Sequence, residues 1–406
     1  MVISTQFRAE KYRFIELFVF ILVGMQTQIV WIAFGPAIQQ AADYYNVSQT
    51  YIVILAALFM AAYIPVNYFA SKMIDDQGLK KGVGIGVYLT GIGGLIKALA
   101  GPQYWICFFG QLLAAIGQPF VLNCWTKLAT NWFLESEKTT AAGLGSISQF
   151  FGVIIAMLFP IHTLGIASTL WVYAILGIVF MAIYQIFARD HPKAPPNEYA
   201  VKKVKMNYTH GMKEILIHNR DFQLLFFILF IGLGVFNALT SEIDLIFESF
   251  TYPNTTSGDI GAAILIGGVV GAIVISTISD KYRKRKMFLV GAFMLGVPTT
   301  LGLIFFRNAD VLYVTSFLYG FIMVSCLPVG LTYAAEITYP HPEETSAGLL
   351  MTAGQISGIL FLFINVSTFL WWMVGMFGAG IILCSLLRDT KWHETQRINK
   401  ETPLES

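Results

Sequence analysis

A carboxylate inside an apolar stretch is the first residue of this sequence that could do chemistry. Glu242, in the sequence Thr240-Ser241-Glu242-Ile243-Asp244, follows about twenty mostly apolar residues. A carboxylate at membrane depth costs several kcal/mol unless it is paired, hydrated or protonated. We therefore expect Glu242 either to bind a cationic substrate or to take up a proton. The alternative is an acid at a helix end in a water-filled vestibule, and it applies more strongly to Asp244.

Amide side chains stand inside other apolar runs. Gln118 and Gln355 each carry a primary amide, which is costly in lipid and normally faces the interior of a helix bundle. Hydrogen bonding between neighbouring helices is the structural alternative for both. Gln26 and Gln28 stand two residues apart, so they point roughly 200° apart on a helix. We expect one of these two to face an interior pathway.

Two residues of opposite charge lie at the ends of two expected helices. Lys127 lies at the end of the apolar run 103–128, and Glu336 ends the run 310–336. These runs occupy equivalent places in the two halves of the chain, so Lys127 and Glu336 could form a gate pair. Equally, each could pair with Glu137 or with Asp75 and Asp280 in neighbouring loops.

Composition decides what kind of elements hold these side chains. The 406 residues are 56% hydrophobic and only 12% charged, and the mean hydropathy is +0.65. A soluble domain carries roughly 25% charged residues, so a water-soluble fold is excluded and nothing suggests a nucleic-acid partner. The cysteines lie inside apolar runs without metal-ligand spacing. With no nucleophile beside a base and no nucleotide loop, we expect neither an enzyme nor a cofactor or metal.

The apolar runs predict an all-α membrane protein with twelve transmembrane helices in two six-helix bundles. The first six runs are 14–41, 50–70, 82–100, 103–128, 140–162 and 167–188, and the second six are 222–249, 258–279, 287–306, 310–336, 346–366 and 368–387. We accordingly divide the chain into an N-terminal half, 1–188, a linker, 189–221, a C-terminal half, 222–388, and a tail, 389–406. The linker is rich in proline and lysine and reads as a tether, with a short surface helix around 211–218.

Basic residues alternate from loop to loop and orient the chain. They collect after the second, fourth and eighth runs, at Lys72, Lys80, Lys81, Lys127, Lys138 and Lys281 to Lys286. Only Lys97 and Arg307 fall toward the opposite side. By the positive-inside rule, both termini and the linker are cytoplasmic. The short tails and the lack of a large outer loop favour an integral protein of a cytoplasmic membrane, inner or plasma, and most simply a prokaryotic one.

An internal repeat links the two halves. Asp75-Asp76-Gln77-Gly78-Leu79-Lys80 follows the second run, and Asp280-Lys281-Tyr282-Arg283-Lys284-Arg285 follows the eighth. The stretch 137–141 leads to Gln149 and Gly152, and the stretch 343–347 leads to Gln355 and Gly358 with identical spacing. Equivalent chemistry at equivalent places indicates two copies of one structural unit.

These two copies resemble the short motif after helices two and eight of the major facilitator superfamily, an acid followed by glycine and basic residues. The sequence departs from that motif at Asp76 and at Arg283. The resemblance implies alternating access, in which two halves rock about a central site. It also implies that Asp75, Gly78, Lys80, Asp280 and Lys281 form a conformational latch. The alternative makes these acids ordinary loop residues.

A closer resemblance, spread along most of the chain, is to the feline leukaemia virus subgroup C receptor family, whose members are described as haem exporters and as choline and ethanolamine transporters. Its strongest stretches are Glu336-Ile337-Thr338-Tyr339-Pro340, Glu344 through Leu350, and Gln355 through Phe361. The resemblance implies substrate contacts at Trp31, Gln118 and Gln355. A tryptophan face holds a quaternary ammonium by cation-π attraction, and a glutamine amide orients a hydroxyl without adding charge.

The match also has departures. The family's helix-seven tyrosine falls on Asn237, and Glu242 and Asp244 replace uncharged residues. We expect a monomeric facilitator or secondary transporter of a small organic cation such as choline or ethanolamine, with a proton or sodium as possible coupling ion. The alternatives are an exporter of haem or another amphipathic metabolite, and a sensor that binds solute without moving it.

Overall fold

A computed structural model describes residues 10–134, 137–158, 161–193, 208–248, 257–306, 308–338, 341 and 343–388. The expected tail 389–406, the middle of the expected linker and Arg307 lie outside these residues. All regular structure within them is helical, as the hydrophobic runs predict.

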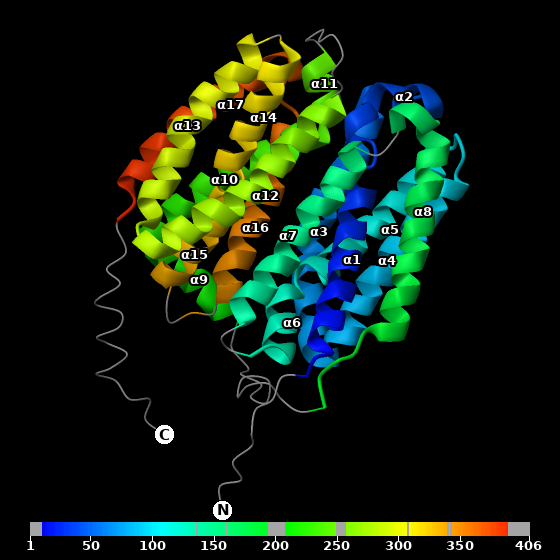
Figure 1. Cartoon of the computed structure of the whole chain (residues 1–406), viewed down its shortest axis with the longest axis horizontal. Helices are drawn as coiled ribbons and strands as arrows, with labels where there is room; N and C mark the ends of the chain where they lie inside the picture. Colours follow the sequence, from blue (N-terminus) through cyan, green and yellow to red (C-terminus); the bar gives the residue numbers. More distant parts are fainter. Residues whose placement is uncertain are drawn as a thin grey trace, which may run out of the picture.

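The described part of the first half contains eight α-helices and one short 3₁₀ helix. They are α1 (Arg13–Ile32), η1 (Gly35–Ala37), α2 (Ile38–Tyr45), α3 (Gln49–Gln77), α4 (Leu79–Leu99), α5 (Tyr104–Leu122), α6 (Trp125–Trp132), α7 (Lys138–Leu158) and α8 (Ile161–Phe187). In Figure 1 they form one of two side-by-side bundles.

The second half forms the other bundle, joined to the first through the short helix α9 (Tyr208–His218), which covers the surface helix expected in the linker. Its helices are α10 (Arg220–Ser241), α11 (Ile243–Glu248), α12 (Ser257–Tyr282), α13 (Arg285–Phe305), α14 (Ala309–Met323), α15 (Cys326–Thr338), α16 (Glu343–Phe361), η2 (Val366–Thr368) and α17 (Phe369–Leu386).

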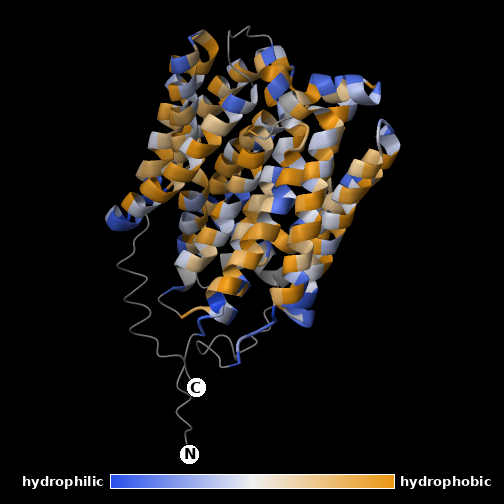
Figure 2. Cartoon of the chain, turned by 45° about the vertical axis from the view of Figure 1, so that its right-hand side comes forward, coloured by the Kyte–Doolittle hydropathy of each residue, from blue (hydrophilic) through white to orange (hydrophobic). Residues whose placement is uncertain are grey.

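These helices give the number of spans that the sequence predicts. Among the described residues, 11 segments are long and apolar enough to cross a membrane, and Thr345–Phe361 is a shorter apolar helix at the eleventh of the twelve expected positions. Figure 2 shows hydrophobic residues along the length of the helices and hydrophilic ones gathered at their ends. Large apolar side chains such as Phe69 and Phe305 are exposed, as expected for a surface that faces lipid.

Four of the twelve expected spans are interrupted, and they are equivalent in the two halves. The run 14–41 breaks between α1 and α2, and its counterpart 222–249 breaks between α10 and α11. The runs 103–128 and 310–336 break between α5 and α6 and between α14 and α15. Prolines explain two breaks: Pro36 has no N–H for the Ile32 carbonyl, and Pro328 has none for Val324. The Val324 carbonyl instead accepts a bond from Leu327 N at 3.3 Å.

Small residues set the spacing of the helices within each half. A side chain at Gly93 would collide with the Gly110 carbonyl across the contact of α4 with α5, and one at Gly320 would collide with the Ile264 carbonyl across the contact of α14 with α12. Close helix contact at glycine is typical of membrane proteins, where packing replaces the hydrophobic effect. It makes each bundle a compact unit that can move as a body.

Contacts between the halves gather at one end of the molecule. We call the end where α1 begins and α17 ends the terminal face, and the opposite end the far face (Figure 1). Toward the far face, α12 packs on α7 and η1, α16 packs on α3, and α11 packs on α2. A methyl group at Gly258 would touch the Met157 carbonyl, and one at Gly35 would lie 3.0 Å from the Thr240 carbonyl. The far face is therefore closed by direct contact between the halves.

Candidate binding cavity

Side chains from both halves line one cavity between the bundles. The lining from the first half is Gln28, Trp31, Phe59, Gln118, Leu122, Gln149, Phe150 and Val153; that from the second half is Leu229, Gly232, Leu233, Phe236, Asn237, Tyr319, Met323, Val324, Cys326, Leu327, Met351, Gly354 and Gln355. The space free of atoms, including its opening, is about 990 Å³, at the upper end of the range for small-molecule pockets. None of these described lining residues carries a charge.

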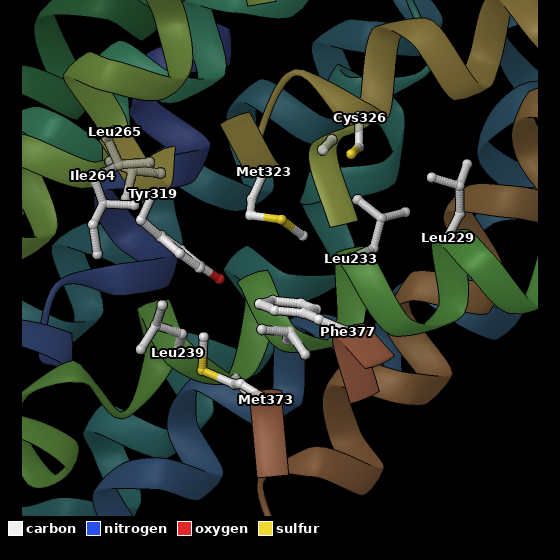
Figure 3. Close-up of a cluster of buried hydrophobic side chains, with 14 of the residues drawn as sticks. Leu229, Leu233, Leu239, Ile264, Leu265, Tyr319, Met323, Cys326, Met373 and Phe377 are labelled. Atoms are coloured by element: carbon white, nitrogen blue, oxygen red, sulfur yellow. The ribbon is translucent and has the colours of Figure 1, made fainter. Parts of the chain in front are cut away.

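Apolar and sulfur-containing side chains form the second-half wall. Figure 3 shows Leu229 and Leu233 on α10, Tyr319 and Met323 on α14, and Cys326 on α15. Phe150 and Phe236 meet edge to face across the halves, with ring centroids 6.0 Å apart. The wall thus provides aromatic and polarisable surface with few fixed hydrogen-bonding groups.

Trp31 lies in the last turn of α1, just before the break at Pro36. Its indole Nε1 donates to the Ala56 carbonyl of α3 at 3.3 Å. Because the ring nitrogen is tied to α3, the remaining aromatic surface can face the cavity that the residue lines. Trp31 is 7% exposed, so a bound molecule would meet a desolvated ring.

The three predicted amide residues of the site share this cavity with Trp31. Gln118 of α5 is buried, and Gln355 of α16 is partly buried. Asn237 of α10 lines the same space and donates from Nδ2 to the Gly354 carbonyl at 3.1 Å. The structure therefore brings Trp31, Gln118, Asn237 and Gln355 together from four helices.

Two further glutamines line the cavity and were not assigned to a site from the sequence. Gln28 of α1 faces it, whereas Gln26 donates from Nε2 to the Tyr173 carbonyl at 3.2 Å and is absent from the lining. Of the two glutamines Gln26 and Gln28, it is therefore Gln28 that faces the interior cavity. Gln149 of α7 is the second addition. Its signal was present in the sequence, because Gln149 holds the repeat position of Gln355.

The two halves present their amides in the same way. A methyl group added to Gly152 would lie 2.9 Å from Gln28 Cβ, and one added to Gly358 would lie 2.9 Å from Asn237 Cβ. Gly152 and Gly358 hold equivalent repeat positions, three residues after Gln149 and Gln355. Each half therefore contributes an amide pair, Gln28 with Gln149 and Asn237 with Gln355.

Glu242 lies apart from this cavity. It follows α10 directly, is 3% exposed and does not belong to the lining residues. Its Oε2 atom has no hydrogen-bond partner among the described residues. The structure thus places the buried Glu242 carboxyl group near the far face, without a partner for Oε2 among the described residues. In this conformation Glu242 does not line the cavity and would not contact a molecule bound there.

Asp244 occupies a junction between the halves. It accepts hydrogen bonds from Ser257 Oγ at 2.7 Å and from the backbone N–H of Gln39 at 3.4 Å. Ser257 Oγ also lies 3.3 Å from the Pro36 carbonyl. Asp244 therefore helps to join α2 and η1 to α11 and α12 where the far face is closed.

Charges at the terminal face pair within each half, so Lys127 takes the second of its two predicted alternatives, an acid of the repeated motif, and not the contact with Glu336 in this conformation. Lys127 Nζ lies 2.8 Å from Asp75 Oδ1. Arg285 Nε lies 3.1 Å from Glu336 Oε1, and its Nη1 lies 2.6 Å from Asp280 Oδ1. Glu336 pairs with Arg285 because Arg285 belongs to the same bundle. The buried guanidinium of Arg285 also presents several donors in a fixed fork, which contact both Asp280 and Glu336.

The remaining motif residues form a turn docked on the linker. Gly78 has φ +92°, a conformation that favours glycine. Lys80 N donates to Asp190 Oδ1 at 2.7 Å, so an acid from the start of the linker caps α4. Lys281 is exposed. The acid at this helix N-terminus is thus Asp190, which sequence reasoning missed because it lies about a hundred residues from its partner.

Comparison with known proteins gives a consistent match. The family model of the Major Facilitator Superfamily matches residues 17–362. Solute carrier family 49 member A3 of Xenopus tropicalis is 30% identical over 377 residues, which is 88% of this chain and 78% of that one. The choline/ethanolamine transporter FLVCR1 of Felis catus is 27% identical over 375 residues, which is 86% of this chain and 66% of that one.

Solved structures agree on the fold. The crystal structure of a D-xylose-proton symporter superposes with a TM-score of 0.74, at 11% sequence identity, over 94% of this chain and 99% of that one. At this identity the likeness concerns the arrangement of helices alone.

Proposed function

This chain belongs to the major facilitator superfamily of transporters and is related to the solute carrier 49 choline/ethanolamine transporters, and from this premise we propose that it carries a small organic cation of choline or ethanolamine type across the membrane. One observation carries the proposal: an uncharged cavity in which Trp31 lies together with amides from both bundles.

The lining suits a cation that is weakly hydrated. Without a carboxylate among the described lining residues, a metal cation would lose more on dehydration than the cavity returns, so an organic ammonium fits the cavity better. A quaternary ammonium can instead be held by an aromatic face, a contact worth about 0.5–2 kcal/mol. Trp31 supplies that face, and Tyr319 and Phe236 line the same space, which offsets the family tyrosine replaced by Asn237.

The amides would fix the uncharged end of the substrate. Gln118 and Gln355 can each donate to and accept from a hydroxyl group. Asn237 donates one amide hydrogen to the Gly354 carbonyl, and in our proposal its side-chain oxygen is a further acceptor for the substrate. A molecule with a cationic head and one hydroxyl therefore matches this cavity better than a dianionic, haem-like molecule, which would require basic residues.

The way the bundles meet supports alternating access. The halves are joined at the far face, while the charged residues of the terminal face pair within their own bundles. In our proposal the terminal face is cytoplasmic, and this is the state in which the cavity opens toward it. Opening the other way would separate α11 from α2 and bring Asp75, Gly78, Lys80, Asp280, Lys281, Lys127 and Glu336 toward the opposite bundle as latch and gate residues.

Glu242 is the candidate for ion coupling. Among the described residues the buried Oε2 atom of Glu242 has no hydrogen-bond partner, and burial without a partner favours the protonated, neutral form of a carboxyl group over the charged form. Glu242 also lies close in sequence to Asp244, which joins the halves at the far face. We propose that protonation of Glu242 accompanies this opening in a monomeric transporter of a cytoplasmic membrane.

Thermal stabilisation of the purified protein tests the substrate class. Choline, ethanolamine, betaine, haem and a neutral polyol are compared, since a ligand of the folded state raises its melting temperature by mass action. We expect choline or ethanolamine to stabilise the protein and the others to have little effect. Stabilisation by haem alone would overturn the proposal. Counterflow in liposomes then separates a transporter, which exchanges labelled solute, from a sensor, which only binds it.

A further inference from the structure

Lys97 is a buried cation for which the proposed function has no use. It lies in the last turn of α4 and is 1% exposed. Its Nζ atom donates to the Val30 carbonyl of α1 at 3.1 Å and lies 4.7 Å from the centroid of the Phe34 ring. Within the described part of the chain, its partners are thus a carbonyl and a ring, with no carboxylate in ion-pair contact. A buried cation kept at membrane depth requires a reason.

The reason lies in the carbonyl groups at the end of α1. The last four carbonyls of a helix lack intrahelical partners, and here the chain cannot continue as a regular helix because Pro36 follows. Lys97 bonds the Val30 carbonyl, and Gln111 of α5 donates from Nε2 to the Trp31 carbonyl at 3.3 Å. The same Gln111 amide reaches the Leu55 carbonyl of α3 at 3.0 Å.

We propose that Lys97 and Gln111 are positioning residues, which cap the broken end of α1 from α4 and α5 and so hold Trp31 in place at the cavity wall. The inference rests on the proposed function, because it gives Trp31 its contact with substrate. Trp31 is fixed at two points: its carbonyl by Gln111, and its indole nitrogen by the Ala56 carbonyl.

A lysine suits this position for physical reasons. The C-terminal end of a helix carries partial negative charge, which favours a cation, and a charged donor makes a stronger hydrogen bond to a carbonyl than a neutral one. The Phe34 ring adds a second favourable contact. Close packing keeps the lysine there, because a methyl group at Gly110 would lie 3.0 Å from the Lys97 backbone nitrogen.

A double-mutant cycle on radiolabelled choline binding tests the coupling between Lys97 and Trp31. K97M is expected to weaken binding about tenfold in the parent protein and less than about twofold in the W31F background. K97Q keeps a neutral donor and should lose less than K97M. The exposed Lys72 gives the matched control, and K72M should bind as the parent does. Equal losses from K97M in both backgrounds would overturn the proposal.

Hydrogen exchange provides a readout that requires no ligand. Peptides that cover residues 29–38 should exchange faster in K97Q and in Q111M, while peptides from α17 stay unchanged. If K97M does not fold, these two variants carry the test. If W31F leaves choline affinity unaltered, the proposed function loses its site, whereas unchanged exchange at residues 29–38 would refute the positioning role by itself.

Discussion

Lys127 Nζ lies 2.8 Å from Asp75 Oδ1, so these residues close an ion pair inside the first bundle. Arg285 does the same in the second bundle with Asp280 and Glu336. Lys127 lies in the first turn of α6 and Glu336 in the last turn of α15, and each forms its ion pair within its own half. The terminal face therefore has no need of a charge contact between bundles in this conformation, and the repeat units hold their own loops in shape.

Reversal of the Lys127–Asp75 pair should reduce transport with little effect on folding. Asp75 is 74% exposed in its side chain, and exposed pairs contribute about 0–1 kcal/mol to stability. We expect K127D and D75K each to lower the initial uptake rate and the double exchange to restore it. Melting temperatures provide the folding control. A double variant as slow as the single ones would contradict a direct functional pairing.

Gln149 should contribute to substrate affinity as Gln355 does. It lines the cavity in the repeat position of Gln355, and loss of one hydrogen bond costs about 1 kcal/mol, or about fivefold in affinity. Q149A should therefore raise KM about fivefold without a matching fall in kcat. Gln40 is exposed and gives a control on the same residue type. An unchanged KM for Q149A would remove Gln149 from the site.

Glu242 should control how transport depends on pH. Its buried carboxyl group is unpaired among the described residues, and E242Q fixes the group in a neutral, proton-like form. If protonation accompanies opening at the far face, the parent should transport at a pH-dependent rate and E242Q at a rate nearly independent of pH. Uptake measured from mildly acidic to mildly alkaline pH decides the matter. Parallel pH profiles would show that Glu242 has no coupling role.

Gly320 should be intolerant of a side chain. A methyl group there would overlap the Ile264 carbonyl of α12, whereas Gly291 in α13 has no neighbouring atom within 4 Å of the same position. G320A should lower stability by about 1–3 kcal/mol through overpacking, and G291A should be neutral or slightly stabilising because alanine is the better helix former. Thermal unfolding in detergent compares the two. Equal melting temperatures would contradict the close contact of α12 with α14.

Much of the fold was predictable because it depends on local pattern. Long apolar runs can only become spanning helices in lipid, and the prediction of about twelve spans in a major facilitator fold is confirmed. The four breaks that follow α1, α5, α10 and α14 were all missed, since hydropathy continues through them. Pro328 carried a signal for one break, but a proline inside a run is also tolerated, as Pro65 in α3 shows.

The residues of the site could be predicted where the internal repeat or the family resemblance pointed to them. Trp31, Gln118, Asn237 and Gln355 meet at one cavity, while their roles stay predictions. Ion-pair partners were predictable only in part. The pair of Lys127 with Asp75 was one of the alternatives, whereas only the packing of α13 against α15 places Arg285 beside Glu336. Lys97 was visible as a charge in an apolar run, but its function depends on where α1 breaks.

Counterflow of labelled choline in proteoliposomes, with the parent protein and W31A side by side, tests the proposed transport and the role of Trp31 together. We expect exchange by the parent that unlabelled choline inhibits, with affinity reduced about 2- to 30-fold in W31A, as loss of a cation-π contact of about 0.5–2 kcal/mol requires. Equal exchange by the two proteins, or no exchange of choline or ethanolamine by a folded parent, would contradict it.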